Sequence, residues 1–229
     1  MASATACARA ILRGLESHSW ALISNSDLGI NNLITGVCHP SGTSFIINGK
    51  PLKAYNQWYN KTKARLQGEL ETKQHAKWSH RLARMTNKRK WFIDNYMNQA
   101  VAQIVKRCKA EQIGRVVLGY NATWKQNVNL GKRTNQKFCD IPYLTLILKL
   151  THKLASLGIA LDIHEESHTS KCSFVDKEPI GHHEEYVGKR IQRGLFRTAD
   201  GHRINADCNG AANILRKVIG NAVYDGNLI

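Results

Sequence analysis

Apolar and polar positions in the first fifty residues fall into three short runs. WALIS, LITGV and SFIIN are apolar runs of strand length, and the turn-forming segments SDLGINN and HPSGT separate them. Runs of this length bounded by Gly, Pro, Asn and Asp are typical of strands joined by turns. The pattern predicts three consecutive antiparallel strands over residues 20–48.

The next sixty residues change to a helical spacing of apolar positions. From Pro51 to about Gln112 the pattern predicts one long helical hairpin, whose second arm runs from Trp91 to Ile113. The core face of this arm is expected to carry the apolar side chains that recur every three or four positions, namely Ile93, Met97, Ala100, Ile104 and Val105.

Two strands and two helices are predicted in the second half of the chain. RVVLGY at 115–120 and ALDIH at 160–164 have the composition of short strands. An apolar helix is expected over 141–157, ended by Gly158, and a last helix is expected to begin near Asn205. The expected core positions of these two helices are Leu144, Ile147, Leu148, Leu150, Ala211, Leu215 and Val218.

An irregular, charged insert is expected between the last strand and the last helix, up to about Arg203. The order is then three strands, a helical hairpin, a strand, a helix, a strand, an insert and a helix. That is the order of RNase H-like domains, which have a mixed five-stranded sheet with flanking helices. We therefore predict an α/β fold of this class, although element order alone does not establish a function.

Positive charge is concentrated in the predicted hairpin. The chain has 33 Lys and Arg against 17 Asp and Glu, a formal net charge of +16. Ten of these cations lie between Lys61 and Lys90, where the only acids are Glu69 and Glu71. Such an excess favours a polyanionic partner, and nucleic acid is the expected one. No apolar run is long enough to cross a bilayer, so we expect no membrane partner and a cytoplasmic, nucleoid-associated protein.

A polar loop after RVVLGY mixes cations with aromatic residues. It contains two aromatic side chains and four cations: Trp124, Phe138, Lys125, Lys132, Arg133 and Lys137. Loops of this composition suit contacts to a nucleic-acid backbone and stacking on bases. The alternative is that the two aromatic side chains anchor the loop on the core.

Two aspartates occupy positions at which an RNase H-like sheet carries metal-binding carboxylates. Nucleases that use two metal ions gather acids from distant parts of the chain. Asp27 follows the first strand, and Asp207 begins the last helix among Asn205, Asn209 and Asn213. Taken singly, Asp27 is also typical of a turn, and Asp207 of a helix start capped by Asn205.

Several segments together resemble one family, the TnpB (OrfB) proteins of bacterial insertion sequences, which are relatives of type V CRISPR effectors. The similar segments are DLGINNL, VVLGYNATWKQ, ESHTSKCSF, KRIQRGLFR and INADCNGAANILRKV. They extend from about Asp27 to Val218. The resemblance implies a RuvC-type, RNase H-like endonuclease that cuts DNA under the direction of an RNA transcribed from the element, with DNA and that guide RNA as partners.

The resemblance also implies a metal site. Asp27 matches the first catalytic aspartate of the family and Asp207 the last, with Mg²⁺ or Mn²⁺ as the cofactor and no small-molecule ligand. Many members carry a middle catalytic glutamate at the end of the fourth strand, where this chain has Gly119, Tyr120 and Asn121.

Some branches of the family, and the eukaryotic Fanzors, use a glutamate just before a Thr-Ser motif instead. In this chain that implies Glu166 or Glu165. A neighbouring strand lies about 4.8 Å away, so a glutamate at its end can reach the same metals. We prefer Glu166, and since side chains alternate between the faces of a strand, only one of the two is expected to point at the site. The alternative is that both are surface acids.

The zinc ribbon that the family commonly inserts before the last helix is incomplete here. Tetrahedral structural zinc needs four ligands, but this chain keeps only Cys172, with Cys208 in the helix motif, and His182 and His183 do not complete a set. Structural zinc is therefore not expected. The degenerate insert is instead expected to contact the nucleic-acid backbone through Lys189, Arg190, Arg193 and Arg197, and the alternative is a solvated flap.

The expected division of the chain follows from these assignments. A degenerate or flexible segment at 1–20 precedes a nuclease domain at 21–170 and 204–220, with the basic insert at 171–203 and a tail at 221–229. The N-terminal lobe of full-length family members has no counterpart, so a truncated copy is expected. The nuclease hypothesis therefore stands beside a second one, a catalytically inactive nucleic-acid-binding remnant that regulates the element or associates with a full-length homologue. A third hypothesis is a structural or unstable pseudogene product with no function.

Overall fold

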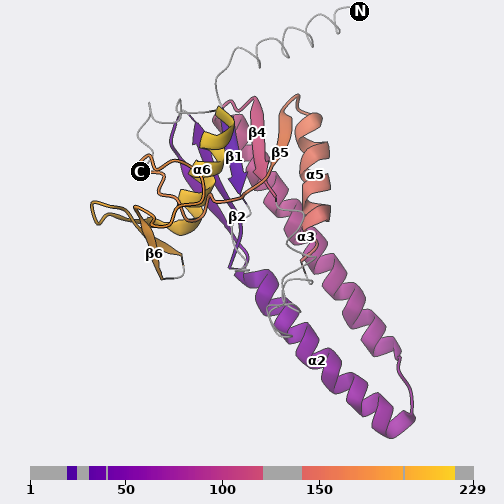
Figure 1. The fold of residues 1–229 in the computed structure, drawn as a ribbon. Helices are drawn as coiled ribbons and strands as arrows, with labels where there is room; N and C mark the ends of the chain where they lie inside the picture. Colours follow the sequence, from indigo (N-terminus) through magenta and orange to yellow (C-terminus); the bar gives the residue numbers. More distant parts are fainter. Residues whose placement is uncertain (1–19, 25–30, 40, 121–140, 193, 220–229) are drawn as a thin grey trace, which may run out of the picture.

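A mixed five-stranded sheet is the centre of the computed structural model, which describes residues 20–24, 31–39, 41–120, 141–192 and 194–219. The strand order is β3-β2-β1-β4-β5 (Figure 1). β1 pairs antiparallel with β2, and β2 with β3, whereas β1 pairs parallel with β4, and β4 with β5. The bounds are β1 Trp20–Ser24, β2 Asn32–His39, β3 Ser44–Asn48, β4 Arg115–Gly119 and β5 Ala160–His164. The predicted strands are thus present.

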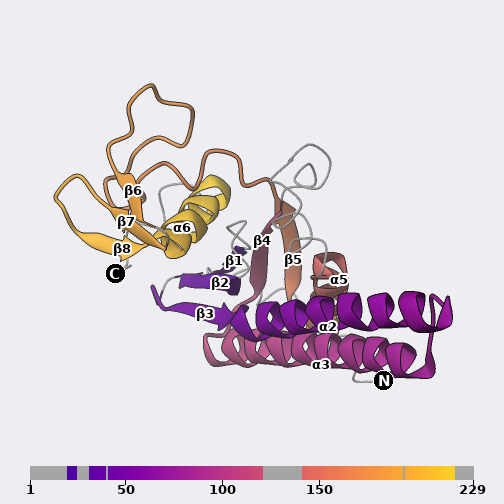
Figure 2. The ribbon, with the colours of Figure 1, turned by 90° about the horizontal axis from the view of Figure 1, so that it is seen from below.

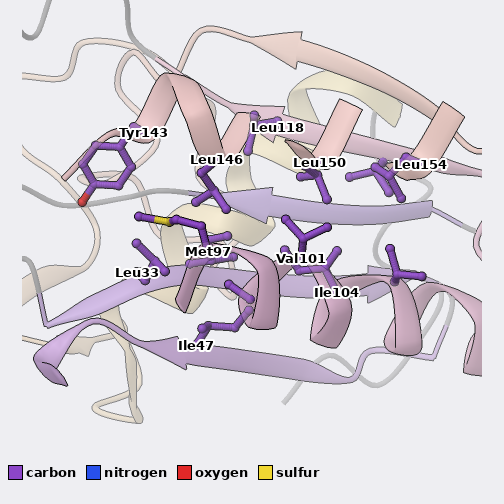
Figure 3. Close-up of a cluster of buried hydrophobic side chains, with 14 of the residues drawn as sticks. Leu33, Ile47, Met97, Val101, Ile104, Leu118, Tyr143, Leu146, Leu150 and Leu154 are labelled. Carbon is purple, nitrogen blue, oxygen red and sulfur yellow. The ribbon is translucent and has the colours of Figure 1, made fainter. Parts of the chain in front are cut away.

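Helices cover both faces of this sheet. α3 (His80–Ala110) and α5 (Tyr143–Ala155) pack on one face, and α6 (Ala206–Ile219) packs on the other. Strand side chains alternate between the two faces, so Val116 and Leu118 enter the α3/α5 core while Val117 enters the α6 core. Figure 3 shows the larger core, in which Met97 and Ile104 of α3 lie among side chains of the sheet and of α5.

The expected core positions of α3 are confirmed, since Ile93, Met97, Ala100, Ile104 and Val105 are all buried. The start of the helix differs from the prediction. α3 begins at His80 and not near Trp91, because the Ser79 side chain accepts a hydrogen bond from the Leu82 N–H and caps the helix. The segment before Trp91 is rich in Lys and Arg and has few apolar residues, so its helical spacing was not recognised in the sequence.

α2 (Lys50–Gln74) runs antiparallel to α3, and the two helices project well beyond the sheet (Figures 1 and 2). Leu66, Leu70 and Leu82 are buried in this projecting part. None of the three belongs to the large core cluster on the sheet. The outer part of the hairpin is therefore held mainly by contacts between its own two arms.

The predicted core stripe of α5 is partly wrong. Leu144 and Leu148 are 54% and 60% exposed, whereas Leu146, Leu150 and Leu154 are buried. Apolar residues surround much of this helix, so their spacing alone did not determine which side faces the sheet. In α6, Ala211 and Leu215 are fully buried, and Val218 packs against the same core, as predicted. Gly158 has φ +73° and follows α5, as a glycine at a helix end does.

The insert contains regular structure that the sequence did not predict. β6 (Lys189–Gln192), β7 (Leu195–Arg197) and β8 (Arg203–Asn205) form a three-stranded antiparallel sheet, and β8 leads directly into α6. Phe196 of β7 is fully buried. Among the described ranges, no helix is both long and apolar enough to cross a membrane.

Candidate functional site

The three parallel strands end at one edge of the sheet. Ser24 of β1 pairs with Gly119 of β4, which pairs with His164 of β5. The main-chain N–H of Tyr120 donates to the His164 carbonyl at 2.8 Å, which extends the pairing by one residue. The segments that leave β1 and β5 at this edge carry the predicted Asp27 and Glu166. Asp27 itself lies outside the described residues.

Glu166 is buried just beyond β5, with 8% of its surface exposed, whereas its neighbour Glu165 is exposed. A tight turn holds it, because the N–H and hydroxyl of Thr169 both donate to the Glu166 carbonyl, the hydroxyl at 2.8 Å. The chain thus turns at Glu166 and directs its side chain inward.

The Glu166 side chain occupies the space beside Gly119 that a larger residue would fill. A methyl group at Gly119 would meet the Glu166 carboxylate and would lie 2.8 Å both from Glu166 Cγ and from Ile214 Cδ1 of α6. Such distances are far below van der Waals contact, and Ile214 is fully buried. The missing side chain at the end of β4 therefore makes room for a carboxylate from the end of β5.

Asp207 is buried in the first turn of α6, and both of its carboxylate oxygens have partners. The Asn32 side chain at the start of β2 donates to Oδ2 at 2.5 Å. Arg190 of β6 donates to Oδ1 at 3.4 Å, as an ion pair. Asn205 caps the helix, because its side-chain oxygen accepts from the Asp207 and Cys208 N–H groups at 2.9 and 3.2 Å.

Asn32 is a residue that sequence reasoning missed at this site. It lies within the DLGINNL segment that carried the family resemblance, but nothing in its local spacing pointed to Asp207, which is 175 positions away. Arg190 was predicted to contact nucleic acid, yet it reaches the same carboxylate from the insert. Three elements that are distant in sequence therefore meet at Asp207.

The two asparagines that follow Asp207 have a structural role. Asn209 accepts from the Phe174 N–H at 2.9 Å and donates to the Cys172 carbonyl at 2.8 Å. Asn213 donates to the carbonyls of Thr169 and Cys172 at 2.9 and 2.7 Å. These amides satisfy buried backbone groups of an irregular segment, which is what polar side chains in a core require. They hold the segment after Glu166 against α6.

Only some of the residues predicted to contact nucleic acid lie among the described residues. Lys189 and Arg197 are exposed and lie opposite each other in the β6–β7 pair. Lys125, Lys132, Arg133, Lys137 and Arg193 lie outside the described residues, as do Trp124 and Phe138.

The residues that were considered as zinc ligands lie in different surroundings. Cys172 is fully buried, and its thiol donates to the Gly181 carbonyl at 3.6 Å. The His182 ring lies edge-on to His168 at 6.4 Å, while His183 bonds the Pro179 carbonyl through Nε2 at 2.7 Å. Burial raises the pKa of the Cys208 thiol. Within the part of the chain that is described, no three His, Cys, Asp or Glu side chains are grouped to hold a metal.

Comparisons with known proteins place this geometry in context. A family model for a probable transposase, OrfB of the IS605 type, matches residues 26–125. A TnpB-like protein, ORF457, of Acidianus two-tailed virus is 25% identical over 212 residues, which are 89% of this chain and 43% of that protein. The chain thus spans less than half of that relative.

Two solved structures share the fold. A cryo-EM structure of a Cas12f1–sgRNA–target DNA complex superposes with a TM-score of 0.59 at 19% identity, covering 85% of this chain and 48% of that one. A CRISPR–Cas12f ternary complex gives a TM-score of 0.60 at 16% identity, covering 85% and 38%. At these identities the likeness concerns the fold alone.

Proposed function

We propose that this chain, which is similar to the OrfB transposase family model and to a TnpB-like protein, is a divalent-metal-dependent DNA endonuclease of the RuvC type, guided by an RNA transcribed from its insertion element. The five-stranded sheet is then an RNase H-like core, with residues 21–170 and 204–220 as the nuclease domain and 171–203 as a degenerate ribbon that forms a basic insert. DNA and the guide RNA are the proposed partners.

The observation that carries this proposal is the position of Glu166. Its buried carboxylate fills the space at the end of β4 in which Gly119 has no side chain. Burying a carboxylate costs free energy unless it is bonded or binds a cation, so a buried glutamate at this position is unlike an ordinary surface acid. We propose that Glu166 supplies the middle catalytic acid.

The chemistry of the donors suits a hard divalent cation. Glu166 and Asp207 offer carboxylate oxygens, which Mg²⁺ and Mn²⁺ prefer. In the proposal these two residues and Asp27 hold the metal, which would activate a water molecule and stabilise the leaving oxygen of the scissile phosphate. The Asn32 amide holds one oxygen of Asp207 at 2.5 Å and so fixes the orientation of that carboxylate.

Exposed cations of the insert complete the proposed site. Lys189 and Arg197 lie side by side on β6 and β7 and are suited to a phosphate backbone. Arg190 connects this small sheet to Asp207. Nucleic acid bound through Lys189 and Arg197 would therefore lie on the same small sheet that carries Arg190.

The test is cleavage of labelled single-stranded and duplex DNA by the full chain, with Mg²⁺ or Mn²⁺ and an RNA transcribed from the end of the element. Glu166→Ala should lower the cleavage rate by more than about 100-fold, because loss of a metal ligand costs more than loss of a partner of that ligand. Glu165→Ala is the matched control, since that glutamate is adjacent and exposed, and it should cleave as the parent does. Asp207→Ala should behave like Glu166→Ala, and Asp200→Ala like Glu165→Ala.

Equal losses of cleavage rate in Glu165→Ala and Glu166→Ala would contradict the assignment of Glu166.

A second candidate function is a nucleic-acid-binding regulator without catalysis. It is favoured by one observation, that Asp207 already engages both Arg190 and Asn32. Salt-sensitive binding with no metal-dependent cleavage by the parent chain would favour this candidate.

A further inference from the structure

The projecting hairpin of α2 and α3 carries two rows of exposed cations and tryptophans. Residues spaced three and four apart lie on one face of a helix. On α2 this spacing joins Trp58, Lys61 and Arg65, and on α3 it joins Arg81, Arg84, Lys88 and Trp91. All seven residues are exposed. We call these two rows the hairpin stripe.

An aromatic contact joins the two helices close to both rows. The Tyr55 ring of α2 stacks on the Phe92 ring of α3 at 4.1 Å and thereby bridges the helices on that side. Trp58 packs against the same Tyr55 ring at 5.4 Å, while Lys88 is one helical turn before Phe92. The Tyr55–Phe92 contact therefore lies next to Trp58 of one row and next to Trp91 of the other.

The charge of the hairpin stripe is strongly positive. It contains five cations and no acid. Arg65 pairs with Glu69 at 2.5 Å, but both side chains are about half exposed, so solvent weakens the pair. A row of cations about 10 Å long on α3 matches the repeating phosphates of a nucleic-acid strand.

The two exposed tryptophans indicate which kind of nucleic acid this surface suits. Trp91 is 80% exposed and Trp58 is 51% exposed, although tryptophan side chains are large and on average mostly buried in folded proteins. Trp91 also lines a hollow of about 640 Å³ between α3 and the start of α5, together with Asp94 and Asn95. An indole ring this exposed is suited to stacking on an unpaired base, and not on a base hidden in a duplex.

We propose that the hairpin stripe binds a single-stranded segment of nucleic acid, with an unpaired base stacked on Trp91 and the phosphates following Arg81, Arg84 and Lys88. The surface reads base faces and phosphates and no sugar hydroxyl, so single-stranded RNA and DNA of one sequence should bind about equally. The inference rests on the nucleic-acid partner of the proposed function but not on cleavage, and it can therefore fail or hold independently of Glu166.

The test is fluorescence anisotropy of a labelled 20-nucleotide strand of mixed sequence with the full chain in EDTA. Trp91→Ala should weaken binding about tenfold, because stacking on an aromatic ring contributes about 1–3 kcal/mol per base. Trp91→Phe should restore most of the affinity. Trp78→Ala is the matched control, since Trp78 is 59% exposed at the hairpin turn but lies outside the stripe, and it should bind as the parent does.

A charge variant tests the phosphate contacts. Lys88→Gln should weaken binding and reduce the slope of log affinity against log salt concentration by about 1, whereas Lys153→Gln, on the exposed side of α5, should leave that slope unchanged. Circular dichroism checks that each variant keeps its helices. Equal effects of Trp91→Ala and Trp78→Ala would overturn the proposal, and so would tighter binding of a duplex than of either single strand.

Discussion

Glu166 occupies the space that a side chain at position 119 would need, so the effects of substitutions at the two positions on stability should depend on each other. Gly119→Ala should destabilise the parent, because the new methyl group would displace both Glu166 and the fully buried Ile214. In a Glu166→Ala background the carboxylate is gone, so the same substitution should cost less by about 0.5–3 kcal/mol. Urea unfolding of the four proteins measures this difference.

A matched control uses Gly68 of α2, where a methyl group would meet nothing within 4 Å. Gly68→Ala should raise stability slightly, because alanine is the better helix former by about 1 kcal/mol. If Gly119→Ala were equally harmless, the Glu166 side chain would not lie against the end of β4.

Cys108 gives the protein a dependence on alkaline pH. Burial raises the pKa of this thiol from 9.0 to about 12, with the nearby Cys38 adding to the shift. Between these values the unfolded chain has lost a proton that the folded chain keeps. The free energy of unfolding should therefore be unaffected below pH 9 and should fall above it by up to about 1.4 kcal/mol per pH unit.

The measurement is urea unfolding of the parent and of Cys108→Ala between pH 8 and 11. The variant starts less stable because it leaves a small cavity, but the gap between the two proteins should shrink as pH rises. A constant gap over this range would mean that the thiol deprotonates alike in both states.

At the scale of elements, the hairpin should be separable from the rest of the fold. Its outer leucines are not part of the core on the sheet, and Tyr59 and Thr86 still join the two arms by a 3.0 Å hydroxyl bond closer to the body. Replacing residues 62–83 with a short Gly-Ser loop should change the Tm by less than about 4 °C, which corresponds to about 1 kcal/mol in a chain of this size.

Thermal unfolding followed by circular dichroism measures this prediction. Leu150→Ala supplies the contrast, because it empties a buried position of the large core and should cost about 2–5 kcal/mol. A shortened chain that unfolds as broadly as a molten state would show that the projecting arms are needed for folding.

Element type followed from the sequence more readily than element orientation. Strands and helices were predicted from local spacing, and the core of α3 was right because Ile93, Met97, Ala100 and Ile104 recur every three or four positions and form one stripe. The stripe of α5 failed at Leu144 and Leu148, since that helix has apolar residues on several sides and only tertiary packing selects among them. The small sheet of the insert was missed because its strands are short and mostly exposed.

At the scale of the whole molecule, the site depends on contacts that no local pattern contains. The partners of Asp207 come from β2 and β6, and the space for Glu166 comes from a glycine on another strand. The family resemblance pointed to Asp207 and Glu166, but not to Asn32. Long-range hydrogen bonds of this kind are visible only after the chain has folded.

The parallel pairing of β1 with β4 cannot form until the chain has been synthesised as far as β4. Trp20 pairs with Arg115, which is 95 positions later, and the long hairpin lies between them. At about 5–20 residues per second, a ribosome takes roughly 5–20 s to make that interval. During this time the first strand has its antiparallel neighbour on one side and an open edge on the other, so co-translational aggregation should begin at that edge.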